Sequence, residues 1–335
     1  MDATESKQNY RVLFTAPGQV TLAALPVPTP GPNELLVRTQ VSLISPGTER
    51  AFFLGLPKTT QQYPQPAGSS NIGEVVGMGS EVTGWQIGDR VASAAVHAAF
   101  VTVAVTDALP VPSGLAGEDA VFFNLASIAL QGVRKAHVEL GEPVAVVGAG
   151  LIGLLALQLA RLQGALPAVS IDQDETRLDF AHQIGADACF VPGADLAAQL
   201  AAICGGAGAA VVIKATGHPE AVKTALACAR PFGRVVLLGS TRGETDGVNF
   251  YRDVHRPGLT VIGAHNIARP RRESHAGWWT EHDDQAVALQ LLAHNRISVR
   301  PFITHRFAAR AAVDAYELLA EWDRTSLGML LTWND

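Results

Sequence analysis

Gly148-Ala-Gly-Leu-Ile-Gly153 stands between the two segments that decide how this chain folds. The apolar run 143–147 precedes it, and the helix-favouring run 154–161 follows it. A second apolar run, 168–171, ends on Asp172. A strand, a glycine turn, a helix and a second strand that closes on an acid together form a dinucleotide-binding fingerprint. The alternative, that these glycines only punctuate an ordinary α/β turn, requires five features to coincide by chance.

Each part of this fingerprint has a mechanical role. Gly148 permits the tight turn, Gly150 lets the backbone approach a pyrophosphate, and Gly153 lets the helix pack against the strand. The N–H groups at the start of the helix attract phosphates. Asp172 can accept hydrogen bonds from the adenosine ribose hydroxyls and would repel a 2′-phosphate, which favours NAD(H) over NADP(H).

The apolar stretch from Val144 to Ala160 does not have the character of a membrane span. It contains three glycines and Gln158, is barely long enough, and begins with strand-like periodicity. We therefore expect no membrane association.

Composition and length set the broad class of the protein. The 335 residues carry a net charge of −6 and are 48% hydrophobic, as expected of a globular protein with about two domains. Because no block of Lys and Arg occurs, we do not expect nucleic acid as a partner. The first residues, 1–6, lack a signal-peptide pattern. Cys189, Cys204 and Cys228 are odd in number and have no CxxC spacing, which favours a reducing, cytoplasmic location.

The chain changes character near residue 120. Before that point, short strand-like pieces between glycine turns predict an antiparallel, barrel-like β domain. Beyond Val144, strands and helices alternate, which predicts an α/β doubly wound parallel sheet. The predicted strands are 35–42, 73–77, 90–92, 210–213, 234–238 and 259–262, and the predicted helices are 118–137, 175–184, 196–203, 220–229, 283–293 and 309–321.

This arrangement resembles the medium-chain alcohol dehydrogenase/reductase family. The segment 82–91, V-T-G-W-Q-I-G-D-R-V, is similar to the family's V-T-G-F-x-x-G-D-R-V turn, and 215–217 reads A-T-G after the fourth predicted Rossmann strand. The resemblance implies a GroES-like β-rich catalytic domain formed by residues 1–122 and 269–335. It also implies a Rossmann NAD(H)-binding domain at 123–268, and a homodimer joined through the edge of the Rossmann sheet.

The residues that hold catalytic zinc in the family are absent from this sequence. Zinc members use a Cys in a G-I-C-G-T-D stretch, a G-H-E triplet, and commonly a second Cys on the helix leading into the cofactor domain. Here Ser45 or Pro46 occupies the first position, the triplet reads Gly68-Ser-Ser70, and Asn124 takes the last position. Neutral serine and asparagine are poor zinc ligands, so we expect no zinc. The sequence of residues 44–50, I-S-P-G-T-E-R, is similar to that of a zinc-less branch of the family. This branch includes bacteriochlorophyllide hydroxyethyl dehydrogenase and proteins linked with sugar or cyclitol oxidation.

Without a metal, ordinary side chains must handle the substrate proton. The resemblance places Thr48 at the family's proton-relay position, with Ser45 nearby, although turn capping is an alternative role for both. Glu49 matches the family's acid after that hydroxyl and is expected to orient its neighbours. His265, after the sixth Rossmann strand, is the preferred general acid/base, against the alternative of a loop histidine bonded to backbone. His97 is a weaker candidate.

The resemblance and the strand-end rule also assign a cofactor site. Residues near the ends of the fifth and sixth strands are expected to bracket the nicotinamide. The candidate catalytic residues are His265, Thr48, Ser45, Glu49 and Asn124, and the candidate cofactor-binding residues are Gly148, Gly150, Leu151, Ile152, Gly153, Asp172, Gln173, Arg177, Thr216, Gly217, Leu238, Gly239, Ser240, Ala264, His265 and Asn266.

Two further features have competing interpretations. The segment 269–272, with Trp278 and Trp279, is either a stacking wall with arginines for a sugar or flat substrate, or a solvated basic loop beside two buried tryptophans. Lys214 is expected to be a surface lysine whose stem is buried and whose amine reaches water.

These observations predict a cytoplasmic, zinc-free, NAD(H)-dependent dehydrogenase of a secondary alcohol, such as a polyol, sugar, cyclitol or hydroxyethyl-bearing ring. An enoyl or quinone reductase is one alternative, and such enzymes tend to prefer NADPH. A dinucleotide-binding protein that has lost its chemistry is the other.

Overall fold

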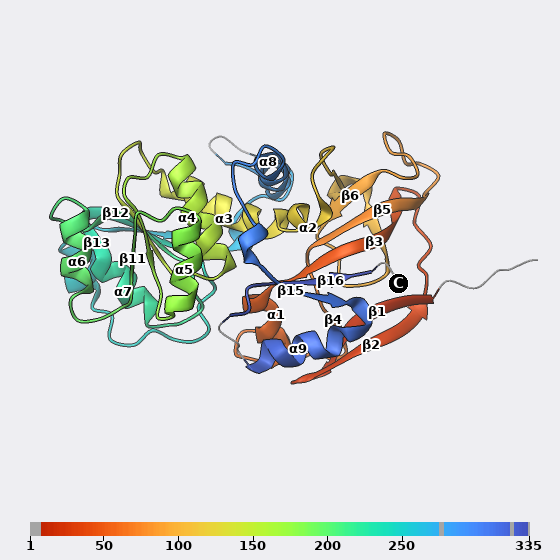
Figure 1. Ribbon diagram of the computed structural model, residues 1–335, viewed down its shortest axis with the longest axis horizontal. Coiled ribbons are helices and arrows are strands. Elements are labelled where there is room, and N and C mark those ends of the chain that lie inside the picture. The colour runs from red at the N-terminus through yellow and green to blue at the C-terminus, as the bar shows by residue number, and fades with distance from the viewer. Residues whose placement is uncertain (1–7, 275–277, 322–324, 334–335) are drawn as a thin grey trace, which may run out of the picture. The chain divides into compact units, whose positions relative to one another are not determined.

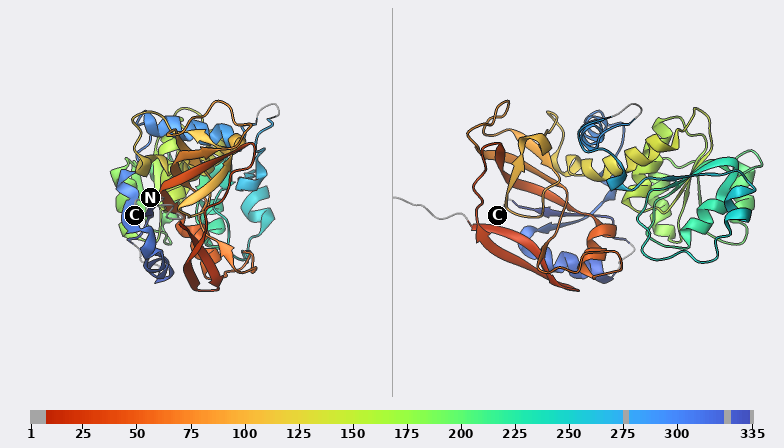
Figure 2. Two further views of the ribbon diagram at one scale, coloured as in Figure 1. Left: turned by 90° about the vertical axis from the view of Figure 1, so that its right-hand side faces the viewer. Right: turned by 180° about the vertical axis from the view of Figure 1, so that it is seen from behind.

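The computed structural model describes residues 8–274, 278–321 and 325–333. The chain divides into two compact units. Unit 1 comprises Met1–Asn124 with Ile303–Asp335, and unit 2 comprises Leu125–Phe302. Figures 1 and 2 show the β-rich architecture of the first and the layered α/β architecture of the second. None of the helices in the described part of the chain combines the length and the apolar character that a membrane crossing would require.

Unit 2 is built on a six-stranded sheet in the order β11-β10-β9-β12-β13-β14, in which every neighbouring pair is parallel. All four residues of β9 and of β10 are buried, as expected of strands covered on both faces. The strands are β9 (Val144–Val147), β10 (Ala168–Ile171), β11 (Ala188–Phe190), β12 (Ala209–Lys214), β13 (Ala229–Leu237) and β14 (Thr260–Gly263).

Helices connect these strands and cover the sheet (Figure 1). Helices α4 and α5 contact each other, as do α6 and α7, and the winding changes direction between the central strands β9 and β12. In such a sheet the ligand crevice lies outside the carboxyl ends of the strands at this switch point. The helices of unit 2 are α3 (Phe123–Ala136, which begins in unit 1), α4 (Leu151–Leu162), α5 (Glu175–Gln183), α6 (Leu196–Ile203), α7 (Ala221–Cys228) and α8 (Glu281–Ala293), with short turns η2 (Tyr251–His255), η3 (Asn266–Ala268) and η4 (Arg300–Phe302).

Unit 1 contains two sheets, one ordered β2-β1-β4 and one ordered β15-β16-β3-β5-β6-β8, with β7 paired to β3. Strand β3 is the longest of the described strands in unit 1, and its alternation of buried and less buried residues agrees with its central place. The elements are β1 (Gln8–Ala16), β2 (Gln19–Pro26), β3 (Glu34–Ile44), α1 (Pro46–Phe53), β4 (Gln65–Pro66), β5 (Asn71–Met78), β6 (Arg90–Ser93), β7 (Phe100–Ala104), η1 (Val105–Asp107), β8 (Leu109–Pro110), α2 (Gly117–Ala120), β15 (Ile303–Ala308), η5 (Ala309–Ala311), α9 (Ala312–Glu321) and β16 (Gly328–Thr332).

The predicted elements are found with ends shifted by a few residues, and the fold class is confirmed. Several strands have no counterpart among the predicted ranges: β1, β2, β4, β7 and β8 in the first part of the chain, β11 in unit 2, and β15 and β16 in the tail, which was predicted only as helical. The pairing of β15 with β16 is parallel, so unit 1 is not purely antiparallel.

The return to the first unit occurs at residue 303, and the predicted boundary at residue 269 was wrong. The segment 269–302, with α8, belongs to unit 2 because polar contacts tie it there. Arg269 Nη1 donates to the carbonyl of Ser127 at 3.1 Å, and Gln158 exchanges two hydrogen bonds with the backbone of Ser298. Long-range contacts of this kind leave no local sequence signal.

Candidate active site

The glycine turn of unit 2 requires glycine on steric grounds. Gly148 has φ +107°, and a Cβ there would lie 2.9 Å from Thr216 Cβ. A Cβ on Gly153 would lie 1.7 Å from the Gly148 carbonyl oxygen. Helix α4 starts after Gly150 without a side-chain cap, so its first N–H groups have no side-chain acceptor and are placed to bind an anion.

Asp172 follows β10 and contacts the same turn. Its Oδ2 accepts from Ala149 N at 2.6 Å and its Oδ1 from Asp174 N at 3.0 Å. Arg177 Nη1 lies 3.7 Å from the position of a Cβ on Gly150, which places a guanidinium beside the turn. Gln173 is exposed. A carboxylate and a guanidinium therefore both lie at the edge of the predicted adenosine site.

The ends of β12 and β13 pack against the glycine turn. A Cβ on Gly239 would lie 2.6 Å from the carbonyl carbon of Ala215, and a Cβ on Gly217 would lie 3.2 Å from the Ser240 carbonyl oxygen. Leu238 is buried against Gly132 of α3. The structure thus gathers the candidate cofactor residues at the carboxyl ends of β9, β10, β12 and β13.

Lys214 is fully buried, so the prediction of a surface lysine was wrong. Its Nζ donates to the Gly239 carbonyl and to Thr241 Oγ1, both at 2.6 Å. Burial lowers the pKa of Lys214 to about 8. An amine under the loop after β13 therefore fixes the ends of β12 and β13 together.

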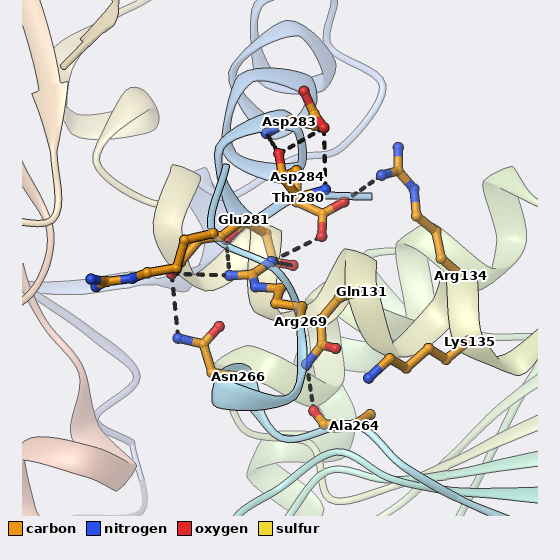
Figure 3. Close-up of polar contacts among 12 residues, drawn as sticks. Gln131, Arg134, Lys135, Ala264, Asn266, Arg269, Thr280, Glu281, Asp283 and Asp284 are labelled. Atoms are coloured by element: carbon orange, nitrogen blue, oxygen red, sulfur yellow. Dashed lines mark hydrogen bonds and ion pairs between the residues drawn. The ribbon is translucent and has the colours of Figure 1, made fainter. Parts of the chain in front are cut away.

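Beyond β14 the chain turns into a polar cluster, drawn in Figure 3. Gln131 on α3 donates to the carbonyl of Ala264, and Asn266 Nδ2 donates to Glu281 Oε1 at 3.4 Å. His265 is exposed, and its Nδ1 accepts from Ile267 N at 3.2 Å. This bond matches the alternative interpretation of His265 as a backbone-bonded loop histidine and leaves Nε2 as its second polar atom.

Arg269 is the centre of this cluster and is buried, so the prediction of a solvated basic loop is wrong at this residue, whereas Arg271 and Arg272 are exposed as it expects. Its side chain is 1% exposed, and Nη1 pairs with Asp284 Oδ2 at 2.9 Å. Asp284 also pairs with Arg134, which lies over the ring of Trp279 at 3.6 Å. Burial raises the pKa of Asp284, and the two guanidinium groups oppose that rise. Trp278 and Trp279 are about half exposed.

Three buried polar atoms of this cluster have no hydrogen-bond partner among the described residues: Gln131 Oε1, Asn266 Oδ1 and Arg269 Nε. Orphaned buried polar atoms cost free energy unless a further group satisfies them. They lie beyond the carboxyl end of β14, on the edge of the sheet at which a ligand is expected.

In unit 1 the residues at the family's metal positions are Ser45, Ser69 and Asn124, and the last two are hydrogen-bonded to each other. Asn124 Nδ2 donates to the carbonyl of Ser69 at 2.6 Å. Leu43 N donates to the carbonyl of Ser70 at 3.1 Å, which joins the end of β3 to the same segment. We call Ser45, Ser69 and Asn124 the metal-position residues.

These residues do not fit zinc. Hydroxyl and amide groups supply no thiolate, imidazole or carboxylate, which zinc prefers. Within residues 8–274, 278–321 and 325–333, no three or more His, Cys, Asp and Glu side chains are grouped as a metal site. The three cysteines are free thiols of unit 2. Thr48 is exposed in the first turn of α1.

A buried polar network beside these residues was not predicted as a unit. Glu49 Oε1 accepts from Ser45 N at 2.7 Å, and its Oε2 accepts from the Tyr316 hydroxyl and lies 3.0 Å from His97 Nε2. His97 Nδ1 lies 2.8 Å from Ser42 Oγ. Trp333 Nε1 donates to the same Ser42 oxygen at 2.9 Å. We call Ser42, Glu49, His97, Tyr316 and Trp333 the Glu49 network. Its members come from segments that are distant in the sequence, so no local pattern predicts that they meet.

Comparison with known proteins agrees with this architecture. Residues 31–114 match the alcohol dehydrogenase GroES-like domain, and residues 152–277 match the zinc-binding dehydrogenase domain. The chain belongs to the medium-chain alcohol dehydrogenase/reductase family. The second of these domains is named for zinc binding, whereas the metal-position residues of this chain carry no zinc-binding side chain.

Individual members of the family are only moderately similar. D-guloside 3-dehydrogenase of Shigella flexneri is 30% identical over 207 residues, which is 61% of this chain and 59% of that protein's length. Human sorbitol dehydrogenase is 26% identical over 95% of this chain and 94% of its own. A solved structure from Sinorhizobium meliloti 1021, described as a zinc-binding dehydrogenase bound to NADP, superposes with a TM-score of 0.83. It is 25% identical and covers 97% of this chain and 99% of its own.

Proposed function

We propose that this protein is an NAD(H)-dependent oxidoreductase that interconverts a secondary alcohol and a ketone without zinc. The observation that carries the proposal is Asp172, whose carboxylate lies against the glycine turn at Ala149 N. A carboxylate there suits the two ribose hydroxyls of NAD and opposes the 2′-phosphate of NADP. The glycine turn itself fits the pyrophosphate, because side chains at Gly148 and Gly153 would collide with backbone or Thr216.

The chemical group supplied by the cofactor is the nicotinamide ring, which exchanges a hydride with the substrate carbon. The protein must then hold the substrate oxygen and exchange its proton. Ser45 and Thr48 offer hydroxyls at the start of α1, and Asn124 offers an amide beside Ser69. His265 offers Nε2, because its Nδ1 is bonded to Ile267 N. These are the groups we assign to the proton.

A polyol, sugar, cyclitol or hydroxyethyl-bearing ring is the proposed substrate class. Two related proteins are a D-guloside dehydrogenase and a sorbitol dehydrogenase, which supports a polyhydroxylated substrate. The neutral hydrogen-bonding character of the metal-position residues suits hydroxyl groups. Because the first relative is matched over only part of its length, we propose a class of substrate and no single compound.

We also propose a homodimer and a cytoplasmic location. Strand β14 forms one edge of the unit 2 sheet and is largely exposed along its length. An exposed strand edge pairs readily with another strand, and a second copy would supply one. The three free thiols suit a reducing compartment.

An enoyl or quinone reductase is the competing activity, and one observation favours it. Arg177 lies beside the glycine turn, where a guanidinium could bind a 2′-phosphate, and the Sinorhizobium meliloti structure contains NADP. Such an enzyme would use NADPH and would not oxidise alcohols.

The test is an activity screen on chelator-treated protein. NAD and NADP are each offered with a panel of secondary alcohols, polyols and sugars, and reduced cofactor is measured by absorbance. We expect NAD reduction with at least one member of the panel and weaker activity with NADP. Preference for NADPH with no alcohol oxidation contradicts the proposal, as does a stoichiometric divalent metal whose removal abolishes turnover. Tight NADH binding without any turnover would indicate a protein that has lost its chemistry.

A further inference from the structure

In the Glu49 network, the residue types decide which group donates in each hydrogen bond. The Trp333 indole can only donate, so Ser42 Oγ accepts from it. The Glu49 carboxylate can only accept, so His97 carries a hydrogen on Nε2 and donates it to Glu49 Oε2. In a neutral His97 the other ring nitrogen, Nδ1, is then an acceptor for the Ser42 hydroxyl. The opposite tautomer would set His97 Nδ1–H against Ser42 and leave the Ser42 hydroxyl hydrogen without this acceptor.

Glu49 is the point on which the network converges. Its carboxylate receives three donors: Ser45 N on Oε1, and His97 and the Tyr316 hydroxyl on Oε2. Glu49 is 4% exposed, and three donors compensate a buried carboxylate. Burial and the neighbouring Glu49 raise the pKa of Tyr316 well above its ordinary value, so the phenol remains a donor.

The residue types Ser42, His97 and Glu49 are those of a hydrolase triad, but the geometry excludes that chemistry. Ser42 and His97 are 0% exposed, and the Ser42 oxygen is already held by Trp333. No substrate carbonyl can approach this hydroxyl. The network must therefore act through the residues it touches.

Those residues are the metal-position segments of unit 1. Glu49 holds the backbone of Ser45, which lies directly before α1. His97 packs against Gly68, where a Cβ would lie 2.6 Å from the His97 ring and where φ is +97°. Gly68 immediately precedes Ser69, which is joined to Asn124. One network thus fixes the end of β3 and the 68–70 segment, two of the places that carry metal ligands in zinc members.

We propose that His97, Glu49 and Tyr316 are positioning residues that hold Ser45 and the 68–70 segment in the geometry of the reaction, in place of a metal cross-link. The inference rests on the proposed alcohol dehydrogenase function. A hydrogen-bonded clamp of this kind leaves neutral side chains at the metal positions Ser45, Ser69 and Asn124. The substrate oxygen is then placed by hydrogen bonds from the metal-position residues, and Glu49 and His97 hold the backbone of those residues in place.

The test compares three variants of the whole protein. Tyr316→Phe removes one donor to Glu49 but keeps the ring that packs on Phe14 and Phe53 at centroid distances of 5.1 and 5.6 Å. His97→Leu removes both ring bonds, and His97→Gln restores an amide donor near Nε2. Matched controls in unit 1 are Tyr10→Phe, whose hydroxyl is exposed, and His305→Gln on β15.

We expect kcat for alcohol oxidation to fall about tenfold in Tyr316→Phe and about a hundredfold in His97→Leu, since small misplacements of reacting groups cost factors of this size. His97→Gln should recover most of the loss, KM should change little, and the controls should match the wild type. The Kd for NADH, measured by fluorescence, should stay within about twofold, because the candidate cofactor residues belong to unit 2.

If the wild-type protein oxidises alcohols, either of two outcomes would overturn the inference. The first is wild-type kcat in Tyr316→Phe and His97→Leu. The second is loss of activity in Tyr316→Phe that only accompanies a large fall in Tm. The ¹⁵N chemical shifts of His97 give a check independent of turnover: the inference requires a pyrrole-type Nε2 and a pyridine-type Nδ1. If the wild type binds NADH but oxidises no alcohol, the proposed function fails instead, and the NMR result still decides the network.

Discussion

Glu49 in unit 1 and Asp284 in unit 2 are both buried carboxylates, but they are compensated in different ways. Asp284 is paired with two guanidinium groups, those of Arg134 and Arg269. Glu49 receives a backbone amide, a phenol and, in the hydrogen-bond arrangement proposed above, a neutral imidazole. An ion pair anchors two chain segments strongly, whereas neutral donors satisfy a carboxylate without adding a second charge.

A third buried ionisable group, Lys214, is compensated by neutral acceptors. Its amine donates to a carbonyl and a hydroxyl, and its pKa shift has burial as its cause. Asp284 in unit 2 therefore joins chain segments through ion pairs. Glu49 in unit 1 positions its neighbours through hydrogen bonds. Four measurements test this contrast.

The greatest loss of stability is expected at the ion-paired carboxylate. Asp284→Ala takes a carboxylate partner from both Arg134 and Arg269 and leaves Arg269 with Glu281 alone as its ion-pair partner among the described residues. We expect the free energy of unfolding to fall by about 3–5 kcal/mol. Urea denaturation followed by circular dichroism measures it. Asp179→Asn, on the exposed face of α5, is the control and should be near neutral. A loss below about 1 kcal/mol for Asp284→Ala would show that the pairs do not hold α8 in place.

A smaller loss is expected at the carboxylate held by neutral donors. Glu49→Gln keeps an acceptor for Ser45 N, and His97 can change tautomer to accept from the new amide. We therefore expect a loss of about 1–3 kcal/mol in the free energy of unfolding. The same denaturation measurement checks it, and a loss as large as that of Asp284→Ala would remove the distinction between the two carboxylates.

Lys214 should make stability depend on pH. Its folded pKa is about 8, while the unfolded amine keeps a pKa of about 10.4. Between these values the unfolded chain binds more protons, so the free energy of unfolding should rise as pH increases from about 8 to about 10. We expect a rise of about 2 kcal/mol relative to Lys214→Met, measured by denaturation at several pH values. Parallel curves for the two proteins would contradict the burial of a charged amine.

The smallest effect is expected at Asp172, the carboxylate beside the glycine turn. Asp172→Asn keeps an oxygen acceptor for Ala149 N but removes the charge that opposes a 2′-phosphate. We expect the ratio of kcat/KM for NADP to that for NAD to rise about tenfold, equivalent to about 1.4 kcal/mol. An unchanged ratio would assign cofactor choice to another group, with Arg177 the first to test.

The two ends of the candidate site also differ in how far the sequence predicts them. The glycine turn and Asp172 are defined by backbone conformation and local spacing, so the sequence pattern places both correctly. Lys214 and Arg269 were misjudged, because a charged side chain in a sequence gives no sign of whether distant segments will bury it. The helical tail 283–293 was assigned to the wrong unit for the same reason, since α8 is held by long-range contacts.

The doubly wound sheet, the dinucleotide turn and the replacement of the zinc ligands follow from the sequence alone, because they depend on periodicity, local sterics and residue identity. The meeting of Ser42, Glu49, His97, Tyr316 and Trp333 in one network does not. These residues come from β3, α1, the segment before β7, α9 and the end of the chain. Hydrogen bonds between such distant positions depend on the packing of the whole unit, which no local pattern encodes.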